Sequence, residues 1–352
     1  MLFKRNELFS GINNLRFKIG ILALVWLILI GSLHIWLNSE RDLRKIIRMG
    51  YMPVITNLSA PILDYITKPG SDTYFQAIKF ASFAEMAEAL RNGQIQAAFM
   101  IAPLSIVLAQ QGEDVRIVYI GNRNESTLVA RKELGIHKIE DLSGRTIAVP
   151  MRFSGHNIAL LNLIDEGKLD QNVRIVEMNP PDMASALSGG SLDAYFVGEP
   201  FAAQALKNNT ATLVSYVEDM WKNFICNLMI VHQNLIDQDP AVVQALVSGA
   251  VGAGIWSHKN TTKAAEIAAT YWKQPEDLVK YALTTPKNRI IYTNYIPREE
   301  ELQYMANLMK KFGLIKRSDI GELVQDRFAR KCDPEKNFEL EDLLRVIRTA
   351  EK

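Results

Sequence analysis

The sequence predicts an α/β protein of two lobes joined by a hinge and preceded by one transmembrane helix. Three observations support this prediction: a long apolar run near the N-terminus, a regular alternation of short apolar and amphipathic stretches after it, and an internal repeat. With 352 residues, the chain is long enough for a membrane segment and two packed domains of ordinary size.

The apolar run extends from Ile19 to Leu37, with Ser32 and His34 as its only polar side chains. Nineteen residues in a helix span roughly 28 Å, close to the ~30 Å hydrocarbon core of a bilayer. No A-x-A-like cleavage triplet follows the run, which favours an uncleaved anchor over a signal peptide. Basic residues such as Lys18 and Arg41 flank it on both sides, so charge alone does not orient the helix.

The alternation after the run is typical of an α/β layout. The predicted strands are Lys45–Met52, Gln76–Phe80, Gln96–Ile101, Val115–Ile120, Ser126–Arg131, Thr146–Val149, Val173–Met178, Ala194–Val197, Thr212–Tyr216 and Cys226–His232. The predicted helices are Phe83–Arg91, Pro103–Gln110, Ser154–Glu166, Pro181–Leu187, Pro200–Leu206, Ala241–Trp256, Thr262–Tyr271, Pro275–Thr284, Arg298–Phe312 and Arg317–Gln325.

The internal repeat relates Glu85–Pro103 to Asp182–Pro200, 97 positions later. Eight pairs of identical residues hold register: Met86/Met183, Ala87/Ala184, Ala89/Ala186, Leu90/Leu187, Gly93/Gly190, Ala97/Ala194, Phe99/Phe196 and Pro103/Pro200. Each copy predicts an amphipathic helix that ends at a glycine able to adopt positive φ, then a buried strand, then a helix opened by proline. The repeat favours two related lobes over a chance similarity.

These boundaries divide the chain into six segments. Residues 1–18 are expected in the cytoplasm, 19–37 in the membrane, 44–125 in lobe one and 126–225 in lobe two. Residues 226–335 are expected to return to lobe one with C-terminal helices, and 336–352 to form a terminal helix or tail. Arg123 and Asn124 mark the predicted first crossing between lobes, and Phe224 to Asn227 the return; both are interpreted as hinge packing.

Composition excludes several function classes. A formal net charge of +1 leaves no excess of basic side chains for nucleic acid. Cys226 and Cys332 have no metal-ligand spacing, and two separate thiols are favoured over a disulfide. No catalytic or phosphate-binding motif is present and the five histidines are scattered, so no enzyme, cofactor or metal site is predicted.

Several motifs resemble a known family. Ile139 to Pro150 reads IEDLSGRTIAVP, which is similar to the D-L-x-G-[KR]-x-[IV]-[AG]-V-P block of the NMT1-like solute-binding proteins serving nitrate, taurine and alkanesulfonate importers. Gly93 to Pro103 resembles the family's G-x-[IVL]-D-x-A block, with Gln96 replacing the usual Asp, which Asp193 keeps in the second copy. The resemblance covers roughly residues 44–310.

Two shorter stretches look most like the nitrate and bicarbonate branch. They are Phe153 to Asn157, reading FSGHN, and Gly198-Glu199-Pro200. Asp64 to Tyr74 departs from the family pattern, which puts a familiar nitrate pocket in doubt. The resemblance implies a type II periplasmic-binding-protein fold, capture of a small anionic or zwitterionic solute, and partnership with an importer permease and ATPase. It also places the large domain outside the cytoplasm.

Ligands of open α/β sheets bind where strand carboxyl ends meet helix N-termini, and two lobes would bring two such edges together. In lobe one the candidate ligand-binding residues are Tyr51, Met52, Pro53, Asn57, Ser59, Ala102 and Pro103. Asn57 and Ser59 are equally ordinary as turn and capping residues.

In lobe two the candidates are Arg152, Ser154, Gly155, His156 and Glu199. Ser154 suits a helix N-cap, and with Arg152 nearby the free N–H groups would suit an anion. Surface exposure of Arg152 and simple packing of His156 are the alternative. Glu199 either complements a helix dipole or faces the cleft, where it would repel an anion.

Two other functions fit the same pattern. One is a membrane-tethered ligand sensor. The other is an enzyme on the same bilobal fold, such as the lyases of menaquinone synthesis or the pyrimidine-forming thiamine enzymes, which resemble these binders. The absence of a Cys-rich motif argues against the thiamine type.

Overall fold

The computed structural model describes residues 4–38, 44–333 and 339–350, so parts of the predicted segments 1–18 and 336–352 lie outside the described residues. The chain divides into two compact units, Met1–Arg44 and Lys45–Lys352. The first contains one helix, α1 (Lys4–Asn38). Its stretch Phe17–His34 has a mean hydropathy of 2.0 and buries none of its residues within the protein.

One other described helix is long and apolar enough to cross a membrane. Helix α10 (Pro240–Lys259) has a mean hydropathy of 1.3, but 78% of it is buried inside the second unit. Its small and aliphatic residues pack against α2, α14 and α15. We therefore assign it to the core.

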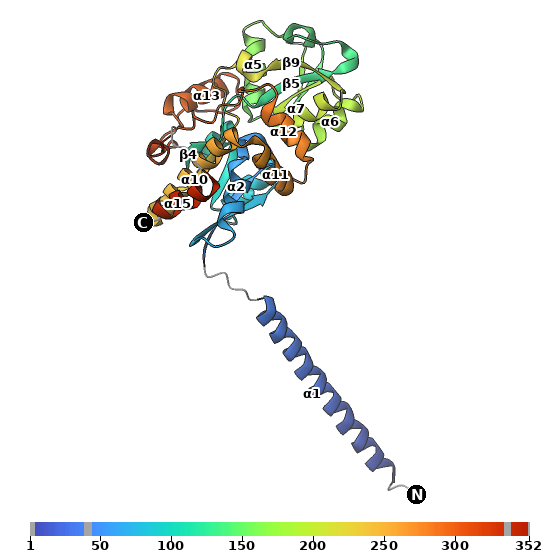
Figure 1. Cartoon of the computed structure of the whole chain (residues 1–352). Coiled ribbons are helices and arrows are strands. Elements are labelled where there is room, and N and C mark those ends of the chain that lie inside the picture. The colour runs from blue at the N-terminus through green and yellow to red at the C-terminus, as the bar shows by residue number, and fades with distance from the viewer. Residues whose placement is uncertain (1–3, 39–43, 334–338, 351–352) are drawn as a thin grey trace. The chain divides into compact units, whose positions relative to one another are not determined.

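Two five-stranded sheets form the second unit (Figure 1). The first has the order β2-β1-β3-β10-β4 and the second β7-β6-β8-β5-β9. The strands are β1 (Lys45–Tyr51), β2 (Thr73–Lys79), β3 (Ala97–Ile101), β4 (Val115–Ile120), β5 (Ser126–Arg131), β6 (Thr146–Val149), β7 (Arg174–Glu177), β8 (Ala194–Gly198), β9 (Ala211–Tyr216) and β10 (Asn227–His232). All ten predicted strands are confirmed. We call the first sheet with its helices the first lobe, and the second sheet with its helices the second lobe.

The sheets have the same mixed topology. In each, the second strand in order pairs in parallel with both neighbours, and the next two pairings are antiparallel. An irregularity of register lies at the same place in both, between Met229 and Ile230 in β10 and between Leu128 and Val129 in β5. The lobes are therefore related along the whole sheet.

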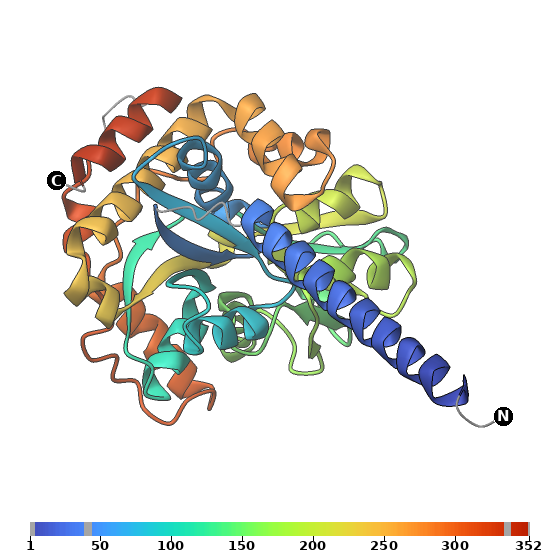
Figure 2. The same ribbon diagram turned by 90° about the horizontal axis from the view of Figure 1, so that it is seen from below.

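Helices cover both faces of each sheet. The longer ones are α2 (Ser59–Thr67), α3 (Phe83–Arg91), α4 (Ala102–Gln110), α5 (Gly155–Asp165), α6 (Pro180–Ser188), α7 (Phe201–Lys207), α11 (Thr261–Trp272), α12 (Glu276–Thr284), α13 (Glu299–Lys311) and α15 (Leu340–Ala350). The short helices are α8 (Val217–Met220), α9 (Gln233–Gln238) and α14 (Arg327–Arg330). Figure 2 shows the blue strands of the first sheet with helices on both sides.

Side-chain alternation explains why both faces are covered. Along β3, Phe99 packs with α2, α10 and α11, while Met100 packs with α3, α4 and α13 on the other face. In β8, Phe196 packs towards α5, and Tyr195 and Val197 towards α6 and α7. A strand buried on both faces reads as the continuous apolar run seen in the sequence.

The repeat is confirmed in atomic detail. Gly93 and Gly190 both have positive φ (68° and 79°), and each donates its N–H to the leucine three residues earlier. Gln96 and Asp193, which occupy equivalent positions in the two copies, each accept a backbone N–H from the neighbouring strand. The Gln96 amide oxygen accepts the N–H of Arg48 at 3.0 Å, and the Asp193 carboxylate accepts the N–H of Thr146 at 2.9 Å. Glutamine therefore preserves the acceptor that the family pattern provides with aspartate.

The chain passes between the sheets after β4 and returns before β10. Arg123 in the first passage forms β-bridges with Ile225 in the return and with Ile291, which comes from a third segment. Backbone hydrogen bonds of 3.0 and 3.1 Å join Arg123 and Ile291 in both directions. The first sheet contains β1 to β4 and β10, and the second contains β5 to β9, so the chain crosses between the lobes twice. The exact lobe borders at residues 125 and 225 stay predictions.

One helix prediction was wrong. Residues 317–325 form no helix, because this segment pairs with the edge of the first sheet. Ile117 donates its N–H to the Leu323 carbonyl at 2.7 Å, and Gln325 donates to the Ile117 carbonyl at 2.9 Å. Gly321, with a φ of 52°, turns the chain before this bridge.

Candidate functional site

A small cavity of about 10 Å³ lies where the strand ends of the two lobes meet. It is lined by Val54, Phe83, Ile101, Pro150, His156, Pro180, Val197, Gly198, Cys226 and Asn227. This volume is about the room that one water molecule needs. The lobes touch directly beside it, since Ile55 donates its N–H to the Glu199 carbonyl at 2.8 Å. The structure therefore shows the lobes in contact around the cavity.

The lining follows the internal repeat. Phe83 and Pro180 are the first residues of α3 and α6, 97 positions apart. Ile101 and Gly198 end β3 and β8 with the same spacing. The first lobe thus contributes the large member of each pair and the second lobe the small one. The cavity lies between equivalent edges of the lobes, but its two walls differ in bulk.

His156 is the ionisable imidazole of this lining, and it is buried. Its Nε2 lies 2.9 Å from Ser126 Oγ, whereas its Nδ1 has no hydrogen-bond partner within the described part of the chain. The ring packs edge-on against Phe196 and Phe224. Burial lowers the pKa of His156 to about 3, so the ring is neutral at physiological pH, and Nδ1 is a buried polar atom without a partner among the described residues.

Asn227 supplies a second neutral polar group. Its Nδ2 donates to Asn57 Oδ1 at 2.8 Å, and Asn57 Nδ2 donates in turn to the Met52 carbonyl at 3.0 Å. This pair fixes the turn after β1 to the start of β10. Ligand contacts here would come from amide and imidazole groups together with helix N-termini.

Glu199 does not line the cavity. Its carboxylate accepts hydrogen bonds from Thr127 Oγ1 and from the N–H of Ala203, each at 2.7 Å. The Arg289 guanidinium lies 4.0 Å away. Glu199 therefore stabilises the start of α7 inside the second lobe, and its predicted repulsion of an anion loses its geometric basis.

Glu125 is a second buried carboxylate of the same cluster. It accepts hydrogen bonds from the Glu199 N–H at 2.6 Å and from Ser126 Oγ at 3.1 Å. Burial raises its pKa to about 7, opposed by hydrogen bonds from Cys226 and the Glu199 backbone. Arg289 closes the cluster, donating to Thr127 and Glu218 and stacking on Tyr216.

The remaining first-lobe candidates do not line the cavity. Tyr51, Met52 and Pro53 are buried, and Val54, the next residue, reaches the cavity. Ser59 donates to the Ala250 carbonyl at 3.0 Å and so joins α2 to α10. Ala102 donates its N–H to the Cys226 carbonyl at 2.9 Å and Pro103 occupies the first turn of α4. Their neighbour Ile101 supplies the lining side chain.

In the second lobe, Ser154 caps α5 by accepting the Asn157 N–H at 3.1 Å. Gly155 follows it against the ring of Phe224. Arg152 is exposed, with its guanidinium over the Phe153 ring at 5.0 Å and its backbone N–H on Glu177. Of the twelve residues expected from the sequence, His156 alone lines the cavity.

Phe83, Pro150 and Pro180 are lining residues that sequence reasoning missed. A signal for two of them was available, because extending the repeat by two residues towards the N-terminus pairs Phe83 with Pro180. Both open helices that point at the interlobe edge. An outer hollow of about 280 Å³ continues from this point and is lined by Ser82, Phe83, Ala84, Pro150, Met151, Glu177, Met178 and Asn179.

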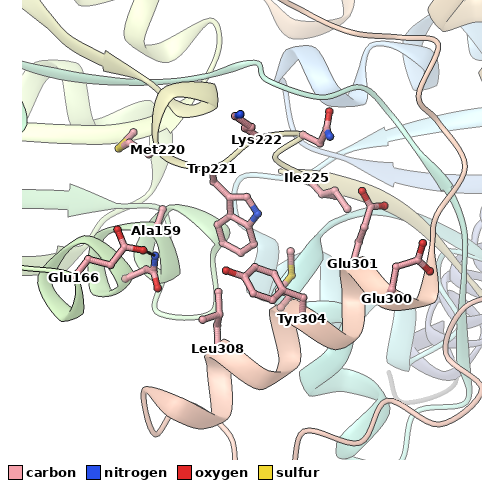
Figure 3. Close-up of a pocket in the computed structure, with 13 residues that line it drawn as sticks. Ala159, Glu166, Met220, Trp221, Lys222, Ile225, Glu300, Glu301, Tyr304 and Leu308 are labelled. Carbon is pink, nitrogen blue, oxygen red and sulfur yellow. Dashed lines mark hydrogen bonds between the residues drawn. The ribbon is translucent and has the colours of Figure 1, made fainter. Parts of the chain in front are cut away.

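A larger hollow of about 440 Å³ lies elsewhere, between α5, α13 and the return passage (Figure 3). Trp221 meets Tyr304 edge-on in it, with ring centroids 5.8 Å apart. Ile225 lines this hollow while the next residue, Cys226, lines the interlobe cavity. The two spaces are thus on opposite sides of the return passage.

Comparison with known proteins identifies the family. Residues 45–271 match the model of the NMT1-like family. The chain belongs to this family. The match covers both sheets and the helices that flank the cavity, and the family is one of binding proteins rather than enzymes.

Individual relatives share less than 30% of their aligned residues with this chain. The chain is 28% identical over 208 residues to the taurine-binding periplasmic protein of Escherichia coli, covering 58% of this chain and 62% of that protein. It is 26% identical over 195 residues to the nitrate import ATP-binding protein NrtC of Synechocystis, covering 50% and 29%. The chain therefore spans less than two thirds of either relative.

Solved structures agree on the fold. The ligand-binding component of an ABC-type import system from Staphylococcus aureus superposes with a TM-score of 0.74 at 20% identity, covering 83% of this chain and all of that one. The periplasmic nitrate-binding protein NrtA of Synechocystis gives 0.73 at 14% identity, covering 88% and 91%. The second unit thus has the type II periplasmic-binding-protein fold.

Proposed function

We propose that this protein is the solute-binding component of an ABC importer and captures a small anion between its two lobes. The observation that carries the proposal is the cavity at the meeting strand ends, with a buried imidazole Nδ1 that has no partner among residues 44–333 and 339–350. Relatives named for nitrate import, taurine binding and sulfonate binding support the ligand class.

Binding would proceed by hinge motion. The passages around Arg123 and Ile225 would bend, the strand ends would separate, and closure would surround the ligand with neutral hydrogen-bonding groups. Among anions we favour a small oxyanion of the nitrate or bicarbonate kind. The FSGHN stretch resembles the nitrate and bicarbonate branch of the family, and it supplies both the Ser154 cap and His156. The contact residues would be those of the cavity together with the predicted turns after β1, β3, β6 and β8.

We further propose that α1 anchors the protein in the cell membrane. Residues 19–37 would span it, residues 1–18 would be cytoplasmic, and the lobes would lie on the extracytoplasmic side. The exposed apolar stretch of α1 and the periplasmic location in relatives' names support this arrangement. Tethering would raise the effective concentration of the binding unit beside its permease and ATPase partners.

A thiol assay tests the proposal with a panel of candidate solutes. Cys226 lines the cavity and is buried, so its alkylation requires the lobes to open. In a Cys332→Ser background it is the one remaining thiol. A true ligand among nitrate, bicarbonate, taurine and alkanesulfonates should slow the alkylation of Cys226 in proportion to site occupancy. Calorimetry on the same samples gives the affinity, and no heat or protection with any of these solutes would contradict the proposal.

A further inference from the structure

Phe83 separates the inner cavity from the outer hollow. It lines both, and Pro150 of the opposite lobe is the other residue that they share. The inner space is about 10 Å³ and the outer about 280 Å³. The two spaces therefore adjoin at these two residues, one from each lobe, and we call this meeting point the constriction.

The position of Phe83 in the fold is well defined. Ser82 caps α3 by accepting the Glu85 N–H at 3.2 Å, which fixes Phe83 as the first helical residue. The Phe83 side chain is 5% exposed and belongs to an apolar cluster that also contains Ile158 of α5 and Ile225 of the return passage. The part of this packing that the second lobe provides to the Phe83 ring, at Ile158, is present only while the lobes are in contact.

In both repeat-related pairs of lining residues, the larger side chain belongs to the first lobe. The equivalent residue in the second lobe is Pro180, and the pair Ile101 and Gly198 shows the same inequality. Gly198 has no room for a side chain, since an added Cβ would lie 2.9 Å from the Glu125 carboxylate oxygens. At this pair, a larger side chain is therefore accommodated in the first lobe and not in the second.

We propose that Phe83 determines specificity by setting the upper size limit of the ligand. Once the lobes move slightly apart, the space behind the ring would take a compact anion, whereas a ligand with a tail would have to pass the constriction into the outer hollow. Replacing Phe83 with a small residue would join the two spaces and admit the longer ligand. This inference rests on the proposed ligand site, but the constriction itself can be tested without any ligand.

The first experiment measures iodoacetamide labelling of Cys226 in the full chain, in detergent, with Cys332→Ser. Phe83→Ala should accelerate labelling roughly tenfold, and Phe83→Leu by less, because the protecting contact is lost. Leu104→Ala is the matched control, since Leu104 belongs to the same apolar cluster, is 7% exposed and lines neither space. Equal acceleration by Leu104→Ala and Phe83→Ala, or none by Phe83→Ala, would overturn the proposal.

The second experiment compares methanesulfonate with hexanesulfonate as protectants of Cys226. The wild-type protein should prefer the short ion, and Phe83→Ala should shift the preference towards the long ion by roughly tenfold. An unchanged ratio of the two protecting concentrations would overturn the role in size selection. If neither ion protects either protein while Phe83→Ala still accelerates labelling, the constriction stands and sulfonate binding by this site is what fails.

Discussion

Arg123 and Glu301 form a bidentate ion pair, with N···O distances of 2.8 and 2.9 Å, at the point where the chain first passes between the lobes. The Arg123 side chain is completely buried, and it also donates to the carbonyls of Asn223 and Asn294. One guanidinium thus joins both passages, the segment before α13, and α13 itself.

Removing either partner of this pair should destabilise the protein. Arg123→Met leaves Glu301 and two carbonyls without their donor, and we expect a loss of about 3–5 kcal/mol in the free energy of unfolding. Glu301→Gln should cost less, because the Gln amide oxygen can still accept one hydrogen bond from the buried guanidinium. Chemical denaturation measures both. Glu300→Gln, beside it on α13, is the control and should change stability by less than about 0.5 kcal/mol.

The buried Glu125 predicts a pH dependence with a definite sign. Its pKa is about 7 in the folded protein against 4.5 ordinarily, so the folded state binds more protons between these values. Its contribution to stability is therefore complete below pH 4.5 and is lost as the pH rises through 7. Glu125→Gln mimics the protonated acid, so its stability advantage over wild type should grow from pH 4.5 and level off above pH 7.

His156 changes stability with pH in the opposite direction to Glu125, and over a lower pH range. Its pKa is about 3 when folded against 6.5 ordinarily, so its contribution is present above pH 6.5 and is lost as the pH falls towards 3. Urea midpoints from pH 4 to 8 separate the two groups when wild type is compared with Glu125→Gln. A difference between the two proteins that does not change with pH would contradict the assignment to Glu125.

The equivalent acceptors Gln96 and Asp193 can be tested as a pair. Asp193→Ala removes the acceptor for the Thr146 N–H and the partner of Arg131, and should cost about 1–3 kcal/mol. Gln96→Asp restores the family residue and should be within about 1 kcal/mol of wild type. Thermal unfolding of both variants decides the point, and a loss at Gln96→Asp as large as that at Asp193→Ala would contradict the equivalence.

Much of the fold was predictable because burial leaves a local signature. β4, β5 and β6 were predicted with their observed bounds, since each is an apolar run ended by turn residues. The failure at 317–325 has the opposite cause. Those residues are amphipathic by pattern, but their backbone is used to extend the sheet beyond β4, a tertiary contact that no local pattern reveals.

The lining of the interlobe cavity, our candidate site, was predictable to the segment but not to the side chain. Sequence reasoning reached Pro53, Ala102 and Glu199, whereas the lining residues are their neighbours Val54, Ile101 and Gly198. These residues lie where strands pass into bends and helices, and side-chain direction there depends on the local backbone, which the strand pattern does not give. Phe83 and Pro150 line the cavity only because the lobes meet, which a single sequence does not encode locally.

The membrane anchor makes a prediction about fractionation. If α1 is retained, the mature protein should sediment with membranes, resist extraction by carbonate and yield a mass that includes residues 17–34. A variant that begins at Lys45 should be recovered in the soluble fraction, because the second unit is compact by itself. A mature N-terminus beyond residue 34 in the native host would show a cleaved signal instead.

Gly155 links the start of α5 to the return passage, and its lack of a side chain is required there. A Cβ at this position would lie 2.6 and 2.7 Å from two ring atoms of Phe224, which is itself fully buried between His156 and Trp221. Gly155→Ala should therefore cost about 1–3 kcal/mol through overpacking, although alanine favours a helix. The loss should shrink in a Phe224→Leu background, where the ring no longer occupies that space. A double-mutant cycle by denaturation measures this coupling, and strictly additive losses would show that the Phe224 ring is not what excludes a side chain at Gly155.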